Sequence, residues 1–178
     1  MVKSRRLEIN GPVLVFITTT ITNWIPVFEN KKYAELVVMQ LDETAKYFKN
    51  LILGYIVMPS HVHLLIGMSD YSTLSKFMQS FKSITSRKLK DLITNEYLNS
   101  LKVNGKYQLW QRRFDDLVIY SEKQFKIKLD YIHNNPIKDG LIENPIDWQY
   151  SSALDWLSNK DGLIKIDKDY SWLNLEYS

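Results

Sequence analysis

Apolar and polar residues alternate along the first part of the chain in patterns that predict strands and a helix. Val13–Thr20 is dominated by β-branched residues, which favours a buried strand. In Lys31–Lys49, apolar residues recur at helical spacing between charged ones, so an amphipathic helix is predicted. Leu51–Met58 and His61–Met68 are again strand-like, and the turn residues Pro59-Ser60 between them predict a hairpin.

The middle of the chain combines a basic helix with a less regular strand. Ser72 to about Leu98 is long and amphipathic, which predicts a second helix. Asn104-Gly105 is a strong turn signal. Tyr107–Tyr120, which follows it, is strand-rich, with an interruption expected at Asp115-Asp116.

A third helix is expected to begin after Ser121, because serine accepts hydrogen bonds from the free N–H groups at a helix start. The helix is expected to run to about Asn134 and to stop at Pro136, since the residue before a proline disfavours helical geometry. The order is then strand, helix, strand, strand, helix, strand, helix. This order predicts an α+β fold, an antiparallel sheet with helices packed on it, compatible with a ferredoxin-like core.

The chain shows no internal repeat, low-complexity tract or linker. Residues 1–178 are therefore expected to form a single domain. Within it, residues 141–178 carry Trp148, Trp156 and Trp172 and are predicted to be a packed C-terminal extension.

The composition restricts the class of protein. With 178 residues, 45% of them hydrophobic, the chain is large enough for one packed core. No apolar run approaches the roughly 20 residues of a membrane helix, and Met1–Asn10 lacks the apolar stretch of a signal peptide. A cytoplasmic protein without membrane association is expected. The absence of cysteine excludes disulfides, thiol nucleophiles and Cys-ligated zinc, so any metal ion must be held by His, Asp, Glu, Asn or Gln.

Charge is distributed unevenly, although the net charge is only +3. Lys76–Arg113 holds nine Lys or Arg against two acids, whereas Asn144–Ser178 holds six acids against three lysines. A segment this basic can follow a phosphate backbone. A solvated helix face is an equally good explanation of the charge taken alone.

His61 and His63 lie two residues apart in a predicted strand. Successive side chains of a strand point to opposite faces, so both imidazoles must lie on one side and Val62 on the other. Two imidazoles in this arrangement can share a metal ion, but a third ligand must come from elsewhere. By itself, such a pair is more often part of an ordinary half-exposed strand.

The helix before Pro136 can supply what the histidine pair lacks. At about 100° per residue, Tyr131 and Asn135 lie roughly 40° apart and can point together at one site. His133 lies about 160° from Tyr131, which argues against all three histidines binding one ion. A separate stripe, within about 60°, is expected to face the core: Phe125, Leu129 and Ile132.

Three motifs follow one another along the chain. Pro59–His63 places a proline shortly before a His-hydrophobic-His strand, and Trp110–Phe114 is a Trp-Gln-x-x-Phe segment. The third is YIHNNPIKDGLI at Tyr131–Ile142, followed by Pro145, Asp147-Trp148 and Ser151-Ser152. With these motifs, the chain from about Val13 to Ser152 resembles the single-tyrosine HUH transposases, in particular the branch associated with repetitive extragenic palindromes (REP).

The resemblance implies a ferredoxin-like HUH nuclease core with the nucleophile on a late helix. It implies that Tyr131 is the nucleophile and that His61, His63 and Asn135 hold Mg²⁺ or Mn²⁺. Some relatives carry Gln where this chain has Asn135. The implied partner is single-stranded or hairpin DNA, bound through basic surfaces. Both monomers and homodimers occur among the relatives, so the oligomeric state stays open.

The residue types fit this chemistry. A phenol has a pKa of about 10, so Tyr131 needs help at neutral pH to attack a phosphodiester, and a divalent ion bound to the phosphate provides it. The product would be a 5′-phosphotyrosine link and a free 3′ hydroxyl, and reversal by a 3′ hydroxyl would join strands without ATP. The sequence thus predicts a tyrosine transposase, a single-strand DNA endonuclease and strand transferase. Tyr120 and Tyr150 are spare candidates for the nucleophile.

DNA contacts are predicted in the basic stretch, where charge and aromatic surface occur together. Trp110 is as easily a core residue as a base-stacking one. The candidate DNA-binding residues are Lys82, Arg87, Lys88, Lys90, Trp110, Arg112 and Arg113.

Two other functions remain open on the sequence. One is a catalytically silent regulator that binds DNA hairpins, against which the intact His61, His63 and Tyr131 argue. The other is a metal-dependent hydrolase that uses His61, His63 and His133. The chain lacks the Asp that usually follows such a histidine pair in zinc hydrolases.

Overall fold

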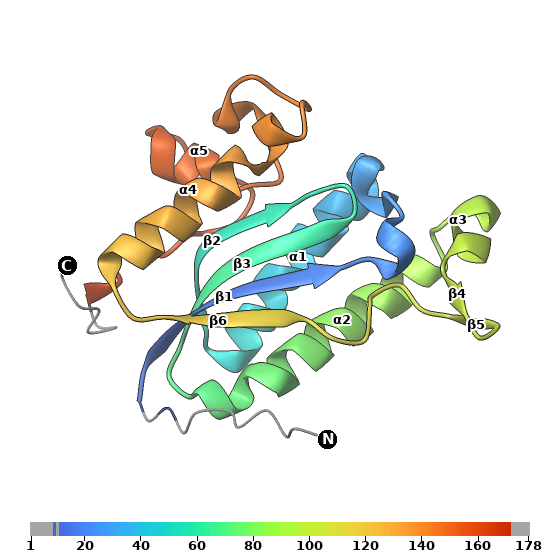
Figure 1. The fold of residues 1–178 in the computed structure, drawn as a ribbon, viewed down its shortest axis with the longest axis horizontal. Coiled ribbons are helices and arrows are strands. Elements are labelled where there is room, and N and C mark those ends of the chain that lie inside the picture. The colour runs from blue at the N-terminus through green and yellow to red at the C-terminus, as the bar shows by residue number, and fades with distance from the viewer. Residues whose placement is uncertain (1–8, 10, 172–178) are drawn as a thin grey trace.

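A computed structural model describes residue 9 and residues 11–171 of the chain (Figure 1). Its strands are β1 Val13–Thr20, β2 Leu51–Val57, β3 His61–Met68, β4 Lys102–Val103, β5 Lys106–Tyr107 and β6 Asp115–Ile119. Its α-helices are α1 Lys31–Phe48, α2 Leu74–Lys90, α3 Asn95–Ser100, α4 Glu122–Lys138 and α5 Ala153–Leu157. Single turns of 3₁₀ helix lie at Thr22–Trp24, Val27–Glu29, Tyr71–Thr73 and Pro145–Asp147. Trp172, assigned above to the C-terminal extension, lies outside the described residues.

Four strands form one antiparallel sheet in the order β2-β3-β1-β6, and β4 and β5 form a separate small hairpin. With α1 between β1 and β2 and α2 between β3 and β6, this is the ferredoxin-like arrangement. The α+β prediction is therefore confirmed. None of the helices in the part of the chain that the structure describes has both the length and the apolar composition of a membrane span.

Each face of the sheet has its own core. Alternate strand residues such as Val15, Val62 and Leu64 pack with α1 and α2 in the larger core. The other residues of the same strands, such as Leu14 and Leu65, pack with α4 in a smaller core. Figure 1 shows α1 and α2 on one side of the sheet and α4 and α5 on the other. The smaller core contains the predicted stripe of α4, Phe125, Leu129 and Ile132.

Gly54 lets α4 approach the sheet closely. A Cβ atom at Gly54 would lie 2.9 Å from Leu129 Cδ1 of α4, so any larger residue would push that side chain away. The register of β2 against β3 shifts between Ile52 and Gly54 at the same place. The glycine therefore helps to set the distance between α4 and β2.

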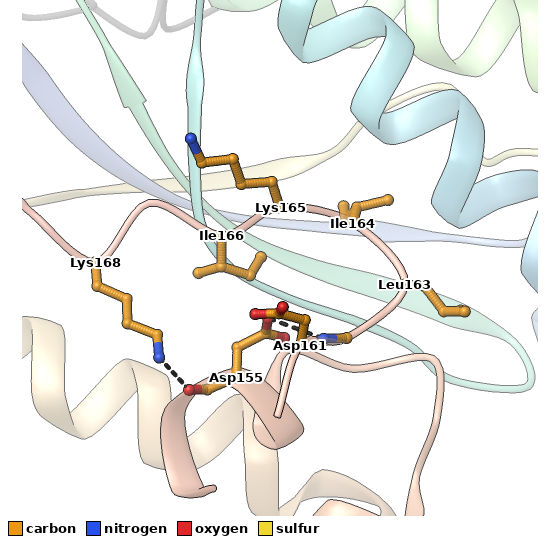
Figure 2. A pocket seen from close by; sticks show the side chains of 8 residues that line it. Asp155, Asp161, Leu163, Ile164, Lys165, Ile166 and Lys168 are labelled. Atoms are coloured by element: carbon orange, nitrogen blue, oxygen red, sulfur yellow. Dashed lines mark hydrogen bonds between the residues drawn. The ribbon is translucent and has the colours of Figure 1, made fainter. Parts of the chain in front are cut away.

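The chain after α4 packs along β2 through backbone hydrogen bonds. Val57 N–H donates to Tyr150 O at 2.9 Å, and Asp167 N–H donates to Ile52 O at 2.9 Å. Between α5 and residues 161–168 lies a cavity of about 410 Å³ (Figure 2). The buried Asp155 carboxylate accepts there from the Gly162 N–H at 3.0 Å, and the Lys168 ammonium donates to the Asp155 carbonyl. Asp155 thus fastens this loop to α5.

Two helix predictions need correction. The helix expected from Ser72 to about Leu98 is broken, because α2 ends at Lys90 and α3 begins at Asn95. Thr94, the residue before α3, has an extended backbone, so the helical path cannot continue through it.

The helix expected to stop at Pro136 instead runs through it to Lys138. Asn135 and Pro136 are both buried, so packing outweighs the local cost of the missing N–H. Just after the end of the helix, Gly140 has a φ of 70°, the left-handed turn that glycine adopts readily.

Asp115-Asp116 does not interrupt a strand but begins one. Asp115 and Asp116 pair with Thr18 and Ile17 at the start of β6. Because β6 is the edge strand and these two residues are exposed, the carboxylates stay solvated.

Candidate active site

β3 places His61 and His63 on the sheet face that α4 covers. In the register of β1 and β3, Thr20 lies opposite His61 and Thr18 lies opposite His63. The rings of the two histidines are close, with 4.8 Å between their centroids. Val62 between them is fully buried in the core on the other face, as the alternation predicted.

His63 is held in a fixed orientation and has one nitrogen left over. Its side chain is 4% exposed, and its ring stacks on Phe16 with centroids 5.5 Å apart. Nδ1 shares a hydrogen bond of 2.8 Å with the Thr18 hydroxyl. Nε2 is buried and has no hydrogen-bond partner within the described residues. Buried polar atoms are rarely left unpaired, which marks this nitrogen as a candidate binding atom.

His61 is less buried and links the strand to α4. Its Nδ1 lies 3.3 Å from the Ser60 hydroxyl, and its ring is hydrogen-bonded to the side chain of Asn135. Asn135 is 7% exposed and comes from the last turn of α4. The three residues predicted as metal ligands, His61, His63 and Asn135, are therefore gathered in one place.

Both histidines are neutral near pH 7. Burial, with smaller contributions from His61 and Lys128, lowers the pKa of His63 from 6.5 to about 3. Burial also lowers the pKa of His61, against the opposing effects of Asp139 and of the Asn135 hydrogen bond. A neutral imidazole has the free nitrogen lone pair that metal binding requires.

Tyr131 lies directly beside the histidines. Its ring centroid is 5.1 Å from that of His63 and 6.0 Å from that of Phe16. The side chain is 37% exposed, so solvent and ligands can reach it. An open cavity of about 490 Å³ adjoins it on α4 and is lined by Ile127, Asp130, Tyr131, Asn134, Ile137 and Lys138.

Two lysines of α4 also surround the tyrosine. Lys128 Nζ lies 5.6 Å from the centroid of the Tyr131 ring and 4.6 Å from that of Phe16. Lys138 Nζ lies 5.0 Å from the Tyr131 centroid. The positive charge closest to the candidate nucleophile thus comes from its own helix, three residues before it and seven after it.

His133 belongs to a different environment. It is 2% exposed, and its Nε2 shares a hydrogen bond of 2.9 Å with the Ser152 hydroxyl. Within the described residues, no group of three His, Asp or Glu side chains is placed to hold a metal ion. The prediction that His133 points away from Tyr131 is confirmed, and the hydrolase built on three histidines does not fit.

Two of the predicted DNA-binding residues have structural roles. Trp110 is 4% exposed, and its indole N–H donates to Thr85 Oγ1 at 2.9 Å, so its ring offers no face to a base. The Lys82 ammonium donates to the carbonyls of Gln111, Arg112 and Arg113, at distances from 2.5 to 3.3 Å. Burial lowers the pKa of Lys82 to about 8. Both residues hold together the segment that leads into β6.

The remaining basic candidates are exposed but lie in two separate places. Arg87, Lys88 and Lys90 are on α2, across the sheet from α4. Lys88 forms an ion pair of 3.3 Å with Glu43. Arg112 and Arg113 are exposed and lie just before β6, at the end of β1 that faces the histidines.

Sequence reasoning missed four residues that surround the site: Thr18, Lys128, Lys138 and Trp24, whose ring centroid lies 5.8 Å from that of His61. Thr18 could have been found by pairing the predicted strands, since it lies opposite His63. The two lysines could have been found on the helical wheel of Tyr131, at positions three before and seven after. No sequence signal pointed to Trp24.

Known proteins share both the sequence and the fold. The family model for IS200-like transposases matches residues 15–135. A protein of Haemophilus influenzae described as a REP-associated tyrosine transposase is 30% identical over 139 residues, covering 70% of this chain and 77% of that protein. The REP-associated tyrosine transposase of Escherichia coli K12 is 29% identical over 99 residues, covering 56% of this chain and 52% of that one.

Solved structures agree on the fold. A REP-associated tyrosine transposase bound to a REP hairpin superimposes with a TM-score of 0.70 at 20% identity, over 96% of both chains. A transposase from Deinococcus radiodurans gives a TM-score of 0.51 at 20% identity, over 75% of this chain and 97% of that one. With the HUH motifs gathered beside one tyrosine and a family match over most of its length, the chain belongs to the IS200-like transposase family.

Proposed function

We propose that this protein cuts and rejoins single-stranded DNA through Tyr131, assisted by a divalent metal ion. The observation that carries the proposal is the Nε2 atom of His63, which is buried beside the Tyr131 ring and has no partner among the residues that the structure describes. A buried polar atom left unpaired costs about 1–3 kcal/mol, so a fold that keeps one is expected to use it.

The residues present fit a metal ion. His61, His63 and the amide oxygen of Asn135 would hold it, and Thr18 and Ser60 already hydrogen-bond the far nitrogens of the two rings. This mixed nitrogen and oxygen donor set without thiolate, open to phosphate oxygens, suits Mn²⁺ or Mg²⁺. When bound, the ion would withdraw charge from the scissile phosphate and orient it.

Tyr131 supplies the nucleophile. Its phenolic oxygen forms a bond to phosphorus while the bond from phosphorus to the 3′ oxygen breaks. The phenol proton passes to solvent, and the departing 3′ oxygen takes up a proton from solvent. The products are a 5′-phosphotyrosine link and a strand with a 3′ hydroxyl. Attack by a second 3′ hydroxyl reverses the step and joins two strands, because the phosphodiester energy is retained in the link.

Lys128 and Lys138 supply positive charge where negative charge develops. Both ammonium groups lie within 6 Å of the Tyr131 ring centroid, so they can reach a phosphate or a phenolate formed at that ring. In a partly buried site, such fixed charges stabilise a developing anion more than they would in water. We assign them the binding of the phosphate at the cut.

Hairpin DNA is the substrate that the relatives support. Two of them are named for REP sequences, and one solved relative holds a REP hairpin. A palindromic repeat that folds back on itself offers a duplex beside an unpaired strand. We therefore propose that the protein acts on the single-stranded DNA next to such a hairpin.

Formation of a covalent adduct tests the proposal. The protein is incubated with a 5′- and 3′-labelled hairpin oligonucleotide and Mn²⁺ or Mg²⁺, then separated under denaturing conditions. A protein band carrying the label of the 3′-side strand is expected, and it should be absent for Tyr131→Phe or in EDTA. Hairpin binding without any adduct would leave only a DNA-binding regulator, and an adduct in Tyr131→Phe would refute the nucleophile.

The same assay shows whether one chain suffices. Tyr131 here lies beside the histidines of its own chain. A mixture of the Tyr131→Phe and His63→Ala proteins is therefore expected to form no adduct. Recovery of the adduct in the mixture would mean that two chains exchange α4 in a homodimer.

A further inference from the structure

Trp24 is an exposed tryptophan beside the candidate active site. Its side chain is 60% exposed, whereas Trp110 is 4% exposed and Trp148 and Trp156 donate their indole N–H groups to backbone carbonyls of β2. Its ring packs edge-to-face with that of His61, with centroids 5.8 Å apart. A ring of this size left to solvent stabilises the fold little, because it buries little apolar area.

The backbone holds Trp24 in an unfavourable conformation. Asn23 has φ 55° and Trp24 has φ 57°, the left-handed region. Asparagine adopts this region readily, but a bulky side chain there is a genuine outlier. Strain of this kind persists where the surroundings over-determine the backbone, and it is concentrated at functional sites.

The surroundings of Trp24 do over-determine it. On one side, Ile21 N–H donates to Ser60 O, directly before His61, at 2.8 Å. On the other side, Thr22 N–H donates to Leu109 O at 2.8 Å, and the Asn23 amide donates to Ser100 O at 3.2 Å. The turn is thus hydrogen-bonded both to the residue before β3 and to residues 100 and 109, which fixes the Trp24 ring relative to His61.

We propose that Trp24 is a stacking platform for an unpaired DNA base next to the scissile phosphate. The inference rests on the proposed function, because it takes the phosphate to lie between His61, His63 and Tyr131. A base adjoining that phosphate would lie within reach of the ring that contacts His61. Every base has a π-face, so a rigid indole binds single strands with little sequence preference. The exposed Arg112 and Arg113 at the same end of the sheet suit the neighbouring phosphates.

The test measures binding of single strands without cleavage. The full chain with Tyr131→Phe, free of metal, is titrated with a short oligothymidine and with the same strand built of abasic sugars. The oligothymidine is expected to quench the tryptophan fluorescence, and Trp24→Phe should remove most of this quenching. Trp24→Ala should weaken binding of oligothymidine about tenfold and leave binding of the abasic strand unchanged.

Tyr47→Ala is the matched control. Tyr47 is an exposed aromatic residue on α1, on the other side of the sheet, and its removal should not change either affinity. Equal affinities of Trp24→Ala and the parent for oligothymidine would overturn the inference. A loss of the same size for the abasic strand would also overturn it, because the ring would then not act on bases.

Trp24→Gly separates binding from folding. Glycine adopts a positive φ without strain. The unfolding temperature of Trp24→Gly should therefore equal or exceed that of the parent, while its affinity for oligothymidine falls. A lower unfolding temperature together with weaker binding would contradict the platform role. Failure of the covalent adduct to form would refute the cleavage proposal. The binding data on Trp24 would still test the stacking role, because they are measured without cleavage.

Discussion

The two faces of the central sheet differ in what they bury. The face under α1 and α2 is closed by apolar side chains, and Val62, Leu64 and Ile66 of β3 all enter that core. The face under α4 is closed over Leu65 but ends in His61 and His63. The same strand thus serves packing on one side and a polar site on the other, because successive side chains alternate.

The site on the α4 face contributes less to the stability of the protein than the apolar core on the other face. On the α4 face, His63 keeps a buried nitrogen without a partner in the described part of the chain, and both site histidines have lowered pKa values. Such an arrangement lowers the free energy of unfolding compared with an apolar residue. Substitutions of the site residues on the α4 face are therefore expected to change chemistry, and substitutions in the core on the other face to change stability.

The largest effect should follow from His61→Ala on the α4 face. Loss of one of the two proposed imidazole ligands is expected to lower the cleavage rate by about a thousandfold or more, because a metal ion bound there would contribute several kcal/mol to the transition state. Hairpin affinity and the unfolding temperature should change little. Gel assays measure the rate of adduct formation and the hairpin affinity. Cleavage at the parent rate would contradict the proposed role of His61.

On the opposite face, Phe77→Ala should act on stability alone. Phe77 is fully buried and packs against Phe48. Its truncation is expected to lower the free energy of unfolding by about 3–5 kcal/mol, as measured by chemical denaturation. At a temperature where the variant is folded, adduct formation per folded molecule should be unchanged. A variant that is stable but inactive would show that the two faces are coupled.

Acid should destabilise the protein partly through His133. Burial lowers the pKa of His133 from 6.5 to about 4, so between these values the unfolded chain binds a proton that the folded chain does not. Stability is fully present above pH 6.5 and falls as the pH decreases toward 4, by roughly 3 kcal/mol for this group. As the pH decreases, the unfolding free energy of the parent should fall more steeply than that of His133→Gln. Parallel pH curves would contradict this.

The smallest of these effects is expected for Lys128→Gln. Loss of one cation near the proposed phosphate position should slow adduct formation about tenfold, with little change in hairpin affinity. Lys123→Gln is the matched control, because Lys123 is an exposed residue of the same helix outside the site. Equal rates for Lys128→Gln and Lys123→Gln would mean that the net charge of α4, and not the position of Lys128, matters.

Local patterns were sufficient for most of the fold. β1 and β3 were predicted with the bounds that the structure has, and α1 and β2 to within one residue at one end. These segments have one strong periodicity and clear turn residues at their ends. The errors lie where local bias and packing compete, as at Pro136, whose burial holds the helix together beyond it.

The sequence by itself determined which reactive side chains share a face of one strand or one helix. Alternation along β3 placed His61 and His63 on one side, and the helical repeat placed Tyr131 with Asn135 and away from His133. Only the tertiary structure decided which groups complete the site. Thr18 meets His63 through strand pairing, and Trp24 meets His61 through a strained turn. Periodicity acts within one element, whereas these contacts depend on how distant elements pair and pack, and no local pattern encodes that.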